Sequence, residues 1–116
     1  MADCIFCKIV KGTIPSEKVW ESEDVLAFKD IEPQAPVHIL LIPKKHIASL
    51  NDLKPEDKDT VANIVLAAQQ IAAEQGVAEN GYRIVNNCGA DGGQIVHHIH
   101  FHLLGGAELG VLNAAK

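Results

Sequence analysis

Three histidines alternate with apolar residues near the end of the chain, and this pattern constrains the fold more than any other feature. The order is His98, Ile99, His100, Phe101, His102 and Leu103. Successive side chains of a strand point to opposite faces of a sheet, so this alternation predicts a half-buried strand. We expect the three imidazoles to share one face, about 6–7 Å apart along the strand. The apolar residues would then pack into the core from the other face.

The strand face that carries the three histidines has a purely structural interpretation as well as a functional one. Three interpretations are open. The imidazoles are hydrogen-bonded polar residues of the sheet, they bind zinc as a triad, or they form another kind of functional site. Polar side chains on a core strand are costly to desolvate without partners, which argues against the first. The glycine-rich residues 89–93 lie directly before the strand. Their backbone N–H groups can approach and hold an anion, so loop and strand together form the candidate site.

Length and composition limit the class of protein. The chain has 116 residues, which suits one domain over 1–116, and 47% of them are hydrophobic, enough for a core. A net charge of −5 argues against non-specific nucleic-acid binding, which needs clustered Lys and Arg. No apolar run approaches the ~18 residues of a membrane span, and Asp3, Cys4 and Lys8 interrupt any signal peptide. Three cysteines make no disulfide framework. We therefore expect a soluble cytoplasmic protein without a membrane partner.

Periodicity and turn residues predict the other elements. Residues 17–21 and 25–29 are expected to be two strands joined by a polar turn, and 37–42 a strongly apolar central strand. A helix is expected to open at Lys54-Pro55-Glu56-Asp57, to carry an apolar stripe at helical spacing, and to end at Gly76. Residues 82–87 predict one more strand.

Two polar features stand apart from these elements. Cys4 and Cys7 form a C-x-x-C pair, which is a redox motif, half of a zinc site, or two buried thiols. No strand precedes the pair, which weakens the redox interpretation. His38 is the one polar side chain in its apolar strand, which predicts a buried, hydrogen-bonded imidazole.

The stretch from His98 to Leu104 resembles the His-φ-His-φ-His-φ-φ signature of the histidine triad (HIT) superfamily. The branch it resembles is Hint, the nucleoside phosphoramidate hydrolases, in its zinc-containing bacterial type. Five more segments are similar to that branch in the same order, namely 5–9, 26–31, 33–38, 42–47 and 81–83. The resemblance therefore extends from about Cys4 to Gly106.

The resemblance implies an α+β fold. It comprises an antiparallel sheet of about five strands, one long helix and a short N-terminal helix. It also implies a homodimer, paired through the long helix and an edge strand so that one sheet crosses both subunits. In many relatives the C-terminus crosses the dimer and adds an aromatic residue to the partner's site. Residues 107–116 of this chain contain no aromatic residue.

The resemblance also implies a catalytic set of His100, His38, His98 and His102. His100 would attack the α-phosphorus of a purine nucleoside phosphoramidate, of the AMP-lysine or AMP-NH₂ type, through a nucleotidyl-histidine intermediate. Neutral imidazole is a good nucleophile near neutral pH. His38 would orient His100 through its other ring nitrogen, while His102, Asn87 and Gly92-Gly93 would stabilise phosphoryl charge.

A purine nucleotide (AMP, GMP or adenosine) is the implied ligand, and apolar side chains would form the slot for its base. Asp30 would accept hydrogen bonds from the ribose hydroxyls, because a carboxylate accepts two and donates none; alone, it could equally be a turn residue. The nucleotide-binding residues implied are Phe6, Ile9, Phe28, Asp30, Ile31, Asn87, Gly93, Gln94, Ile95, His100 and His102.

A structural zinc ion is the implied cofactor. Family members with the cysteine pair hold zinc with it and two histidines, which correspond here to Cys4, Cys7, His46 and His98. Four protein ligands close the coordination shell, so this zinc would be structural. His97 competes with His98 for the fourth position, and Cys88 is a further candidate.

One departure from the family pattern bears on activity. The residue after Gln94 is serine in many Hint enzymes and is Ile95 here. Loss of that hydroxyl donor predicts a rate lower by about tenfold to a hundredfold if its hydrogen bond strengthens in the transition state. Two alternatives therefore accompany the hydrolase: a nucleotide-binding or regulatory protein with weak catalysis, and a dinucleoside polyphosphate hydrolase.

Overall fold

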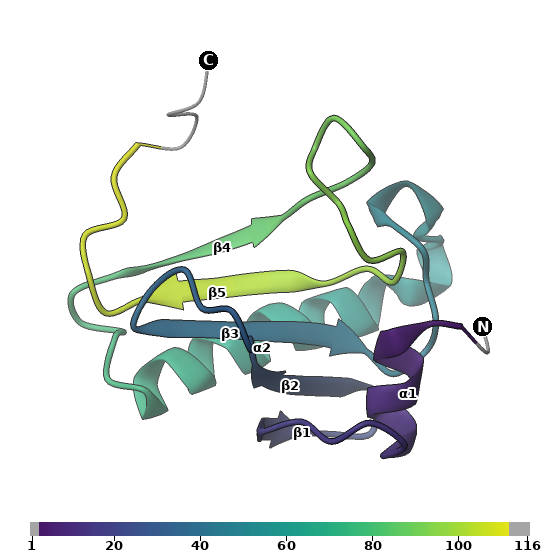
Figure 1. The fold of residues 1–116 in the computed structure, drawn as a ribbon, viewed down its shortest axis with the longest axis horizontal. Helices are drawn as coiled ribbons and strands as arrows, with labels where there is room; N and C mark the ends of the chain where they lie inside the picture. Colours follow the sequence, from purple (N-terminus) through teal and green to yellow (C-terminus); the bar gives the residue numbers. More distant parts are fainter. Residues whose placement is uncertain (1–2, 112–116) are drawn as a thin grey trace.

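A computed structural model describes residues 3–111 (Figure 1). A five-stranded sheet with two α-helices makes up the fold, which confirms the predicted α+β class. In chain order the elements are α1 (Ile5–Lys11), β1 (Lys18–Glu21), β2 (Val25–Lys29), β3 (Val37–Pro43), the 3₁₀ turns η1 (Leu50–Asp52) and η2 (Pro55–Asp57), α2 (Lys58–Glu74), β4 (Tyr82–Asn86) and β5 (Phe101–Gly105).

The sheet is antiparallel throughout, with the strand order β1-β2-β3-β5-β4. The long helix α2 crosses one face of this sheet, while α1 lies against the other face, over the ends of β2 and β3 (Figure 1). The last strand of the sequence, β5, lies between β3 and β4 in the sheet. This order brings the histidine-bearing segment beside the strand that carries His38.

Local sequence explains the two helices. The Sγ atom of Cys4 accepts a hydrogen bond from the backbone N–H of Cys7 at 3.3 Å, which caps α1, and Gly12 ends it at φ +82°. The predicted long helix begins with a 3₁₀ turn at Pro55 before α2 proper. Asp57 accepts from the backbone N–H of Lys54 at 2.9 Å and pairs with Lys45 at 2.8 Å. Asp57, an acidic residue expected at the start of the helix, therefore holds the segment that leads into α2.

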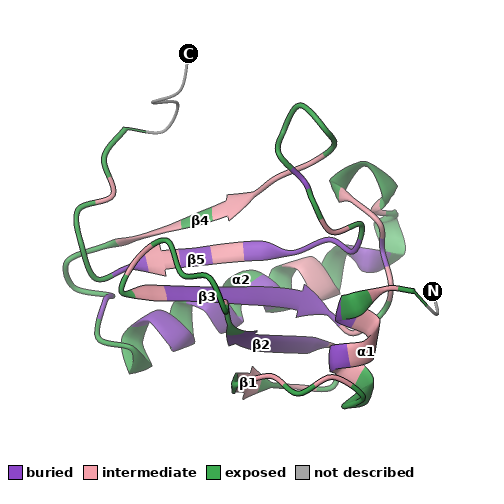
Figure 2. Cartoon of the chain, in the orientation of Figure 1, coloured by how far each residue is buried: buried purple, intermediate pink, exposed green. Residues whose placement is uncertain are grey.

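Buried residues follow β2, β3 and β5 and recur along α2 (Figure 2). They form two hydrophobic cores, one on each face of the sheet. Ile99, Phe101 and Leu103 lie in the core between the sheet and α2, as the alternation predicts. The smaller core lies on the other face and includes Phe6 and Ile9 of α1. The histidines project into this second face, so α1 rather than α2 forms the wall of the candidate site.

The strand predicted from the histidine alternation begins later than expected, because β5 starts at Phe101 and leaves His98 and His100 outside it. The backbone groups before Phe101 find partners outside the strand ladder. The N–H of Ile99 donates to the carbonyl of Ile47 at 2.7 Å, and the carbonyl of His100 accepts from the side chain of Asn86 at 2.9 Å. These hydrogen bonds take the place of strand pairing before Phe101.

Within residues 3–111, no helix is long and apolar enough to cross a membrane. The other predicted strands are confirmed to within two residues at each end. Of the aromatic-free tail, residues 112–116 lie outside the described residues.

Candidate functional site

The three histidines of the motif share one face of the sheet, as predicted. The ring of Phe6 meets the rings of His98 and His100 edge-on, with centroids 5.9 and 5.1 Å away. The ring of His102 lies 5.2 Å from that of His100. His98 is fully buried and His100 is 7% exposed, so both imidazoles are removed from bulk water.

The hydrogen bond of His100 identifies which of its nitrogens is free to react. Nδ1 lies 2.8 Å from the backbone carbonyl oxygen of His98. A carbonyl only accepts, so Nδ1 carries the proton and the neutral ring presents an unprotonated Nε2. A lone pair at Nε2 is the requirement for a nucleophilic imidazole.

His38 contacts His102, and the prediction that it orients His100 is wrong. Nε2 of His38 lies 2.9 Å from Nδ1 of His102. The strand register gives the reason, because His38 is opposite Leu104, which makes His102 the diagonal neighbour and places His100 two residues further away. The carbonyl of His98 takes the orienting role that His38 was expected to have.

One backbone amide sets the proton positions of His38 and His102 together. The N–H of Gln34 donates to Nδ1 of His38 at 3.0 Å, so the proton of neutral His38 is on Nε2 and is donated to Nδ1 of His102. His102 must then carry its own proton on Nε2, a buried atom without a partner among the described residues. The Nε2–H of His102 is therefore fixed as a hydrogen-bond donor next to His100.

Burial keeps these imidazoles neutral. Desolvation, reinforced by His100 and His38, lowers the pKa of His102 from 6.5 to about 4, against the opposing effect of Asp30. Burial likewise lowers the pKa of His38, although Asp30 beside it acts in the other direction. Oδ2 of that aspartate is 3.4 Å from Nε2 of His38. The hydrogen-bond chain described above therefore holds at neutral pH.

The depressed pKa of His102 predicts a loss of stability in acid. The unfolded chain binds a proton on this ring near pH 6.5, whereas the folded protein does not until about pH 4. We expect the His102 contribution to the free energy of unfolding to be complete above pH 6.5 and to decrease as the pH falls towards 4. Urea unfolding across this range, with wild type and His102→Asn, measures it. An unchanged pH slope in the variant would remove His102 as the cause.

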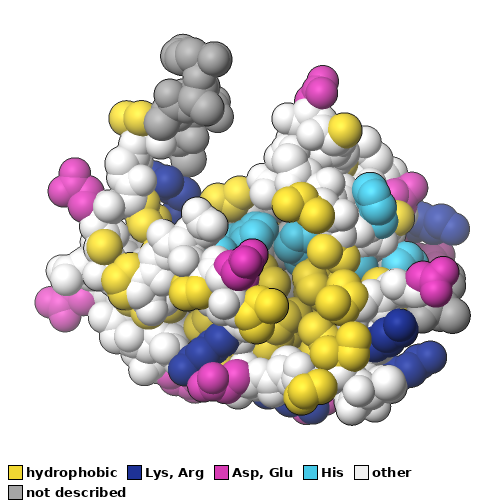
Figure 3. Space-filling view, viewed as in Figure 1, with side chains coloured by type: hydrophobic (Ala, Val, Ile, Leu, Met, Phe, Trp, Pro, Cys, Tyr) yellow, Lys and Arg dark blue, Asp and Glu magenta, His cyan; other side chains and the backbone are white. Residues whose placement is uncertain are grey.

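An apolar cavity of about 340 Å³ opens beside His100 and His102. It contains the predicted base-slot residues: Phe6, Ile9 and Phe28 are buried in its wall, and Ile31 is exposed at its edge. Hydrophobic side chains gather next to the histidines on this face (Figure 3). Asp30 lines the same cavity, and its Oδ1 accepts from the backbone N–H of Glu32 at 2.8 Å. The slot thus combines an apolar wall with one carboxylate.

A second cavity of about 450 Å³ adjoins the first, and Asn87 lines it with His38 and His102. Ile95 borders both cavities and is 87% exposed. Asn87 and Ile95 therefore both line the cavity beside His38 and His102.

Gln94 and Gly93 have structural roles that their predicted contact with nucleotide did not anticipate. The side chain of Gln94 accepts from the N–H of Gly89 at 3.0 Å and donates to the carbonyls of Ala48 at 2.7 Å and Val96 at 3.0 Å. The N–H of Gly93 donates to the carbonyl of Ala90 at 3.0 Å. These hydrogen bonds occupy the side-chain amide of Gln94 and the backbone N–H of Gly93.

Replacing Gln94 is therefore expected to destabilise the protein. Gln94→Ala leaves one backbone N–H and two carbonyls near the buried amide without their partner, at a cost of about 2–3 kcal/mol in the free energy of unfolding. Urea denaturation measures this change. Gln69→Ala, an exposed position on α2, is the control and should stay within about 0.5 kcal/mol of wild type. Equal effects of the two variants would contradict the role assigned to Gln94.

The four predicted zinc ligands form one cluster. Nδ1 of His98 lies 3.3 Å from Sγ of Cys4 and 3.6 Å from Sγ of Cys7, while Nδ1 of His46 lies 3.3 Å from the latter sulfur. A tetrahedral zinc site has S–N edges of about 3.5 Å. Nε2 of His98 donates to the carbonyl of Pro43 at 2.8 Å, which leaves Nδ1 with a lone pair for a metal. The residues present fit the group.

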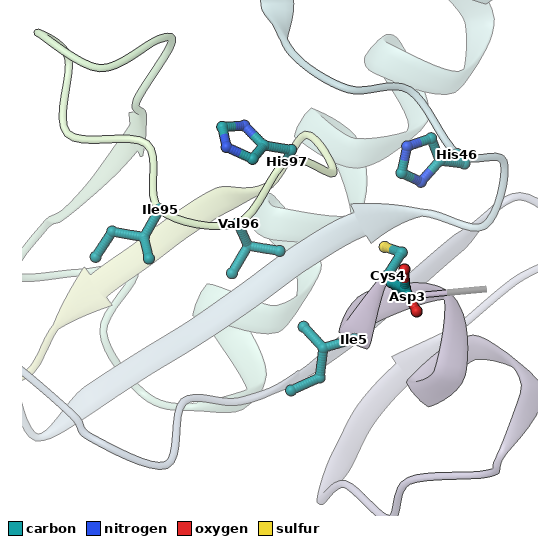
Figure 4. Close-up of a pocket in the computed structure, with 7 residues that line it drawn as sticks. All are labelled: Asp3, Cys4, Ile5, His46, Ile95, Val96 and His97. Carbon is teal, nitrogen blue, oxygen red and sulfur yellow. The ribbon is translucent and has the colours of Figure 1, made fainter. Parts of the chain in front are cut away.

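The geometry decides between the candidates for the fourth ligand. His98 is in the cluster, whereas neither His97 nor Cys88 is among the grouped donors. His97 is exposed and lines a groove together with Cys4 and His46 (Figure 4), but it is not grouped with the four donors. In the sequence, His98 is favoured because it belongs to the histidines that alternate with apolar residues. Only the fold shows that the sulfur atoms of Cys4 and Cys7 lie beside it.

Sequence reasoning missed two groups that hold the site. The N–H of Gln34 fixes the tautomer of His38, and the side-chain amide of Asn86 holds the carbonyl of His100. A backbone donor leaves no trace in a sequence. Asn86 has a weak signal, as a polar residue at the end of a strand beside Asn87.

Comparison with known proteins places the chain in a family. The model of the family described as "Scavenger mRNA decapping enzyme C-term binding" matches residues 3–113. The chain belongs to this histidine triad (HIT) family, in agreement with the histidine motif and the fold.

Individual relatives cover almost the whole chain. A purine nucleoside phosphoramidase of Escherichia coli K12 is 46% identical over 98% of this chain and 96% of its own. The structure of a HIT family hydrolase from Legionella pneumophila is 51% identical, with a TM-score of 0.91 over 93% of this chain and 96% of the other. A histidine triad protein from Clostridium difficile is 50% identical, with a TM-score of 0.93 over 97% of each chain. These relatives support a nucleotide hydrolase.

Proposed function

We propose that the protein hydrolyses purine nucleoside phosphoramidates by way of a nucleotidyl group carried on His100. The observation that carries the proposal is the unprotonated Nε2 of His100, left free by the Nδ1 bond to the His98 carbonyl and placed beside a cavity that also holds Asp30. The E. coli relative named purine nucleoside phosphoramidase supports the same activity.

The first half of the reaction forms a bond between Nε2 of His100 and the α-phosphorus. The P–N bond to the amine breaks, and the amine leaves after its nitrogen takes a proton from solvent. The proton on Nδ1 of His100 stays hydrogen-bonded to the His98 carbonyl, which favours the cationic imidazole of the intermediate. Neutral His102 donates its Nε2–H to a phosphoryl oxygen, where negative charge develops.

The second half of the reaction returns the enzyme to its starting form. Water attacks phosphorus, the bond to Nε2 breaks, and the nucleoside monophosphate leaves with the water oxygen while one water proton goes to solvent. His38 keeps its proton throughout, because its hydrogen bond to His102 fixes orientation without moving a charge.

The cavity supports purine nucleotides such as AMP, GMP or adenosine as ligands. Phe6, Ile9 and Phe28 offer apolar surface to a flat base, and Oδ2 of Asp30 accepts from a ribose hydroxyl. Asn87 borders the phosphate position from the second cavity.

Zinc is the metal that the cysteine–histidine cluster would hold, with Cys4, Cys7, His46 and His98 as ligands. When bound, it supplies a structural cross-link, because four protein ligands leave no open position. Cys4 and Cys7 lie at the start of the seven-residue α1, whose Phe6 contacts His100. The cross-link thus tethers the helix that forms the wall of the base slot.

A homodimer is part of the proposal. β4 is an edge strand that exposes Ile84, and α2 exposes Val65 and Leu66. An exposed strand edge with apolar neighbours is a ready pairing surface. Sedimentation at micromolar concentration tests the dimer, and a monomer there would contradict it.

Hydrolysis of adenosine 5′-phosphoramidate tests the proposed function, with diadenosine polyphosphate and AMP as parallel ligands. Faster turnover of the phosphoramidate supports the proposal. Tight AMP binding without turnover would instead favour a nucleotide-binding protein, and preferential cleavage of the polyphosphate would favour the other hydrolase. The exposed Ile95 at the phosphate position motivates both comparisons.

A further inference from the structure

The backbone of His100 lies outside the regular strand, and groups from other parts of the chain hold it. The peptide unit of His98 and Ile99 comes directly before it. The N–H of that unit donates to the carbonyl of Ile47 at 2.7 Å, and its carbonyl accepts from Nδ1 of His100 at 2.8 Å. On the other side, the carbonyl of His100 accepts from Nδ2 of Asn86 at 2.9 Å. The Cα atom of His100 therefore joins two planar peptide units that are each held by a hydrogen bond, which sets the direction of its side chain.

Asn86 is brought to His100 by the pairing of β4 with β5. The end of β4 lies beside the start of β5 (Figure 1), and the register places Asn86 opposite Phe101. The Asn86 side chain thus reaches the carbonyl of the preceding residue, and it presents Nδ2, because a carbonyl only accepts. Asn86 lines neither of the two cavities beside the histidines. An effect of Asn86 on the reaction would therefore act through the backbone of His100.

The other half of the Asn86 amide argues against a purely structural role. Its Oδ1 atom is buried and has no partner among the described residues. An apolar side chain at this position would leave the His100 carbonyl unpaired, just as the asparagine leaves its own Oδ1 unpaired. The costs of the two unpaired acceptors are similar, so the amide adds little net stability to the fold. What the asparagine provides is a fixed position for the residue that carries the proposed nucleophile.

We propose that Asn86 is a positioning residue, which holds the backbone of His100 so that Nε2 lies within reach of the α-phosphorus of a bound nucleotide. The inference rests on the proposed attack by His100 and deepens it. A nucleophile must lie about 3–3.5 Å from the atom that it attacks, and a displacement of about 1 Å can cost roughly a hundredfold in rate. Nε2 is at the far end of the ring from Cα, so a small rotation of the backbone moves it by a larger distance. The hydrogen bond from Asn86 opposes that rotation.

Asn86→Leu tests the assignment, because leucine keeps the branching at Cγ and removes both the donor and the unpaired acceptor. For adenosine phosphoramidate we expect kcat/KM to fall about tenfold, while the Kd of AMP stays within about twofold of wild type. The midpoint of urea unfolding should shift by less than about 0.5 M, because the unpaired Oδ1 is removed when the His100 carbonyl loses its partner.

A single turnover with rapid quenching separates positioning from a general disturbance of the site. Formation of the adenylyl group on the protein should slow about tenfold in Asn86→Leu, because Nε2 must first reach phosphorus. Hydrolysis of that group should keep its rate within about twofold, because the covalent bond already holds phosphorus at His100. The matched control is Asn63→Leu, which removes an exposed asparagine of α2 whose Nδ2 donates to Asp24 at 2.8 Å. It should leave both half-reactions unchanged.

Four results would overturn the inference and leave the proposed function intact. They are wild-type kcat/KM in Asn86→Leu, equal slowing of both half-reactions, an AMP affinity that falls as much as kcat/KM, and a urea midpoint lowered beyond the expected range. The first would show that Asn86 is not needed, and the others would show that it supports the structure as a whole. Wild-type protein that does not hydrolyse the phosphoramidate, or that forms no adenylyl group, would reject the proposed function itself.

Discussion

His100→Ala is expected to slow hydrolysis of adenosine phosphoramidate by at least a thousandfold, because the variant removes the atom that forms the bond to phosphorus. AMP should still bind within about threefold of the wild-type Kd, because the base slot and Asp30 are untouched and only one neutral contact is lost. The measurement combines steady-state kinetics with calorimetric titration of AMP.

The loss of kcat in His100→Ala is compared with the loss in His102→Ala. His102 donates a hydrogen bond in the proposed mechanism and forms no bond to phosphorus, so its loss should cost about a hundredfold in kcat, less than the loss of His100. A His100→Ala protein that keeps its turnover would contradict the assigned nucleophile. A larger loss in His102→Ala than in His100→Ala would mean that the two roles are exchanged.

Removal of the metal ligands is expected to have the second large effect, on stability. Protein purified without added metal should contain about one zinc per chain, and Cys4→Ser with Cys7→Ser should lose it. The free energy of metal binding is also free energy of folding. A loss of about 3 kcal/mol would lower Tm by roughly 10–20 °C. Elemental analysis and thermal unfolding on the same samples measure both quantities.

Cys88→Ser is the matched control for the metal experiment, because it removes the remaining thiol without touching the cluster. It should keep both the zinc and the wild-type Tm. Wild-type protein that is metal-free and equally stable would contradict the zinc proposal. Loss of zinc in Cys88→Ser would show that the ligand set is wrong.

Residues whose role depends on local pattern could be predicted from the sequence. The alternation of His98–Leu103 placed the imidazoles on one face and Leu103 in the opposite core, as found. The helix after Pro55 and the strand around His38 followed from composition and turn residues in the same way. Family resemblance then grouped Cys4, Cys7, His46 and His98, which come from three separate parts of the chain and lie close together in space.

Residues whose role depends on register or on backbone partners could not be predicted. His38 meets His102 because β3 pairs with β5 so that Leu104, two residues beyond His102, lies opposite His38. Gln94 was expected to bind nucleotide, but three backbone groups that only the fold brings together occupy its amide. The late start of β5 also depends on backbone partners. The side chain of Asn86 and the carbonyl of Ile47 hydrogen-bond to the backbone groups that precede Phe101.

The central claim is that the nucleotidyl group is carried on Nε2 of His100, and trapping that intermediate tests it most directly. Wild-type protein is mixed with excess adenosine phosphoramidate, quenched in alkali during turnover because a phosphorus–imidazole bond is acid-labile, digested, and examined by mass spectrometry. The account predicts an adenylyl adduct on His100. An adduct on another histidine, or steady turnover with inversion at phosphorus and no adduct, would contradict it.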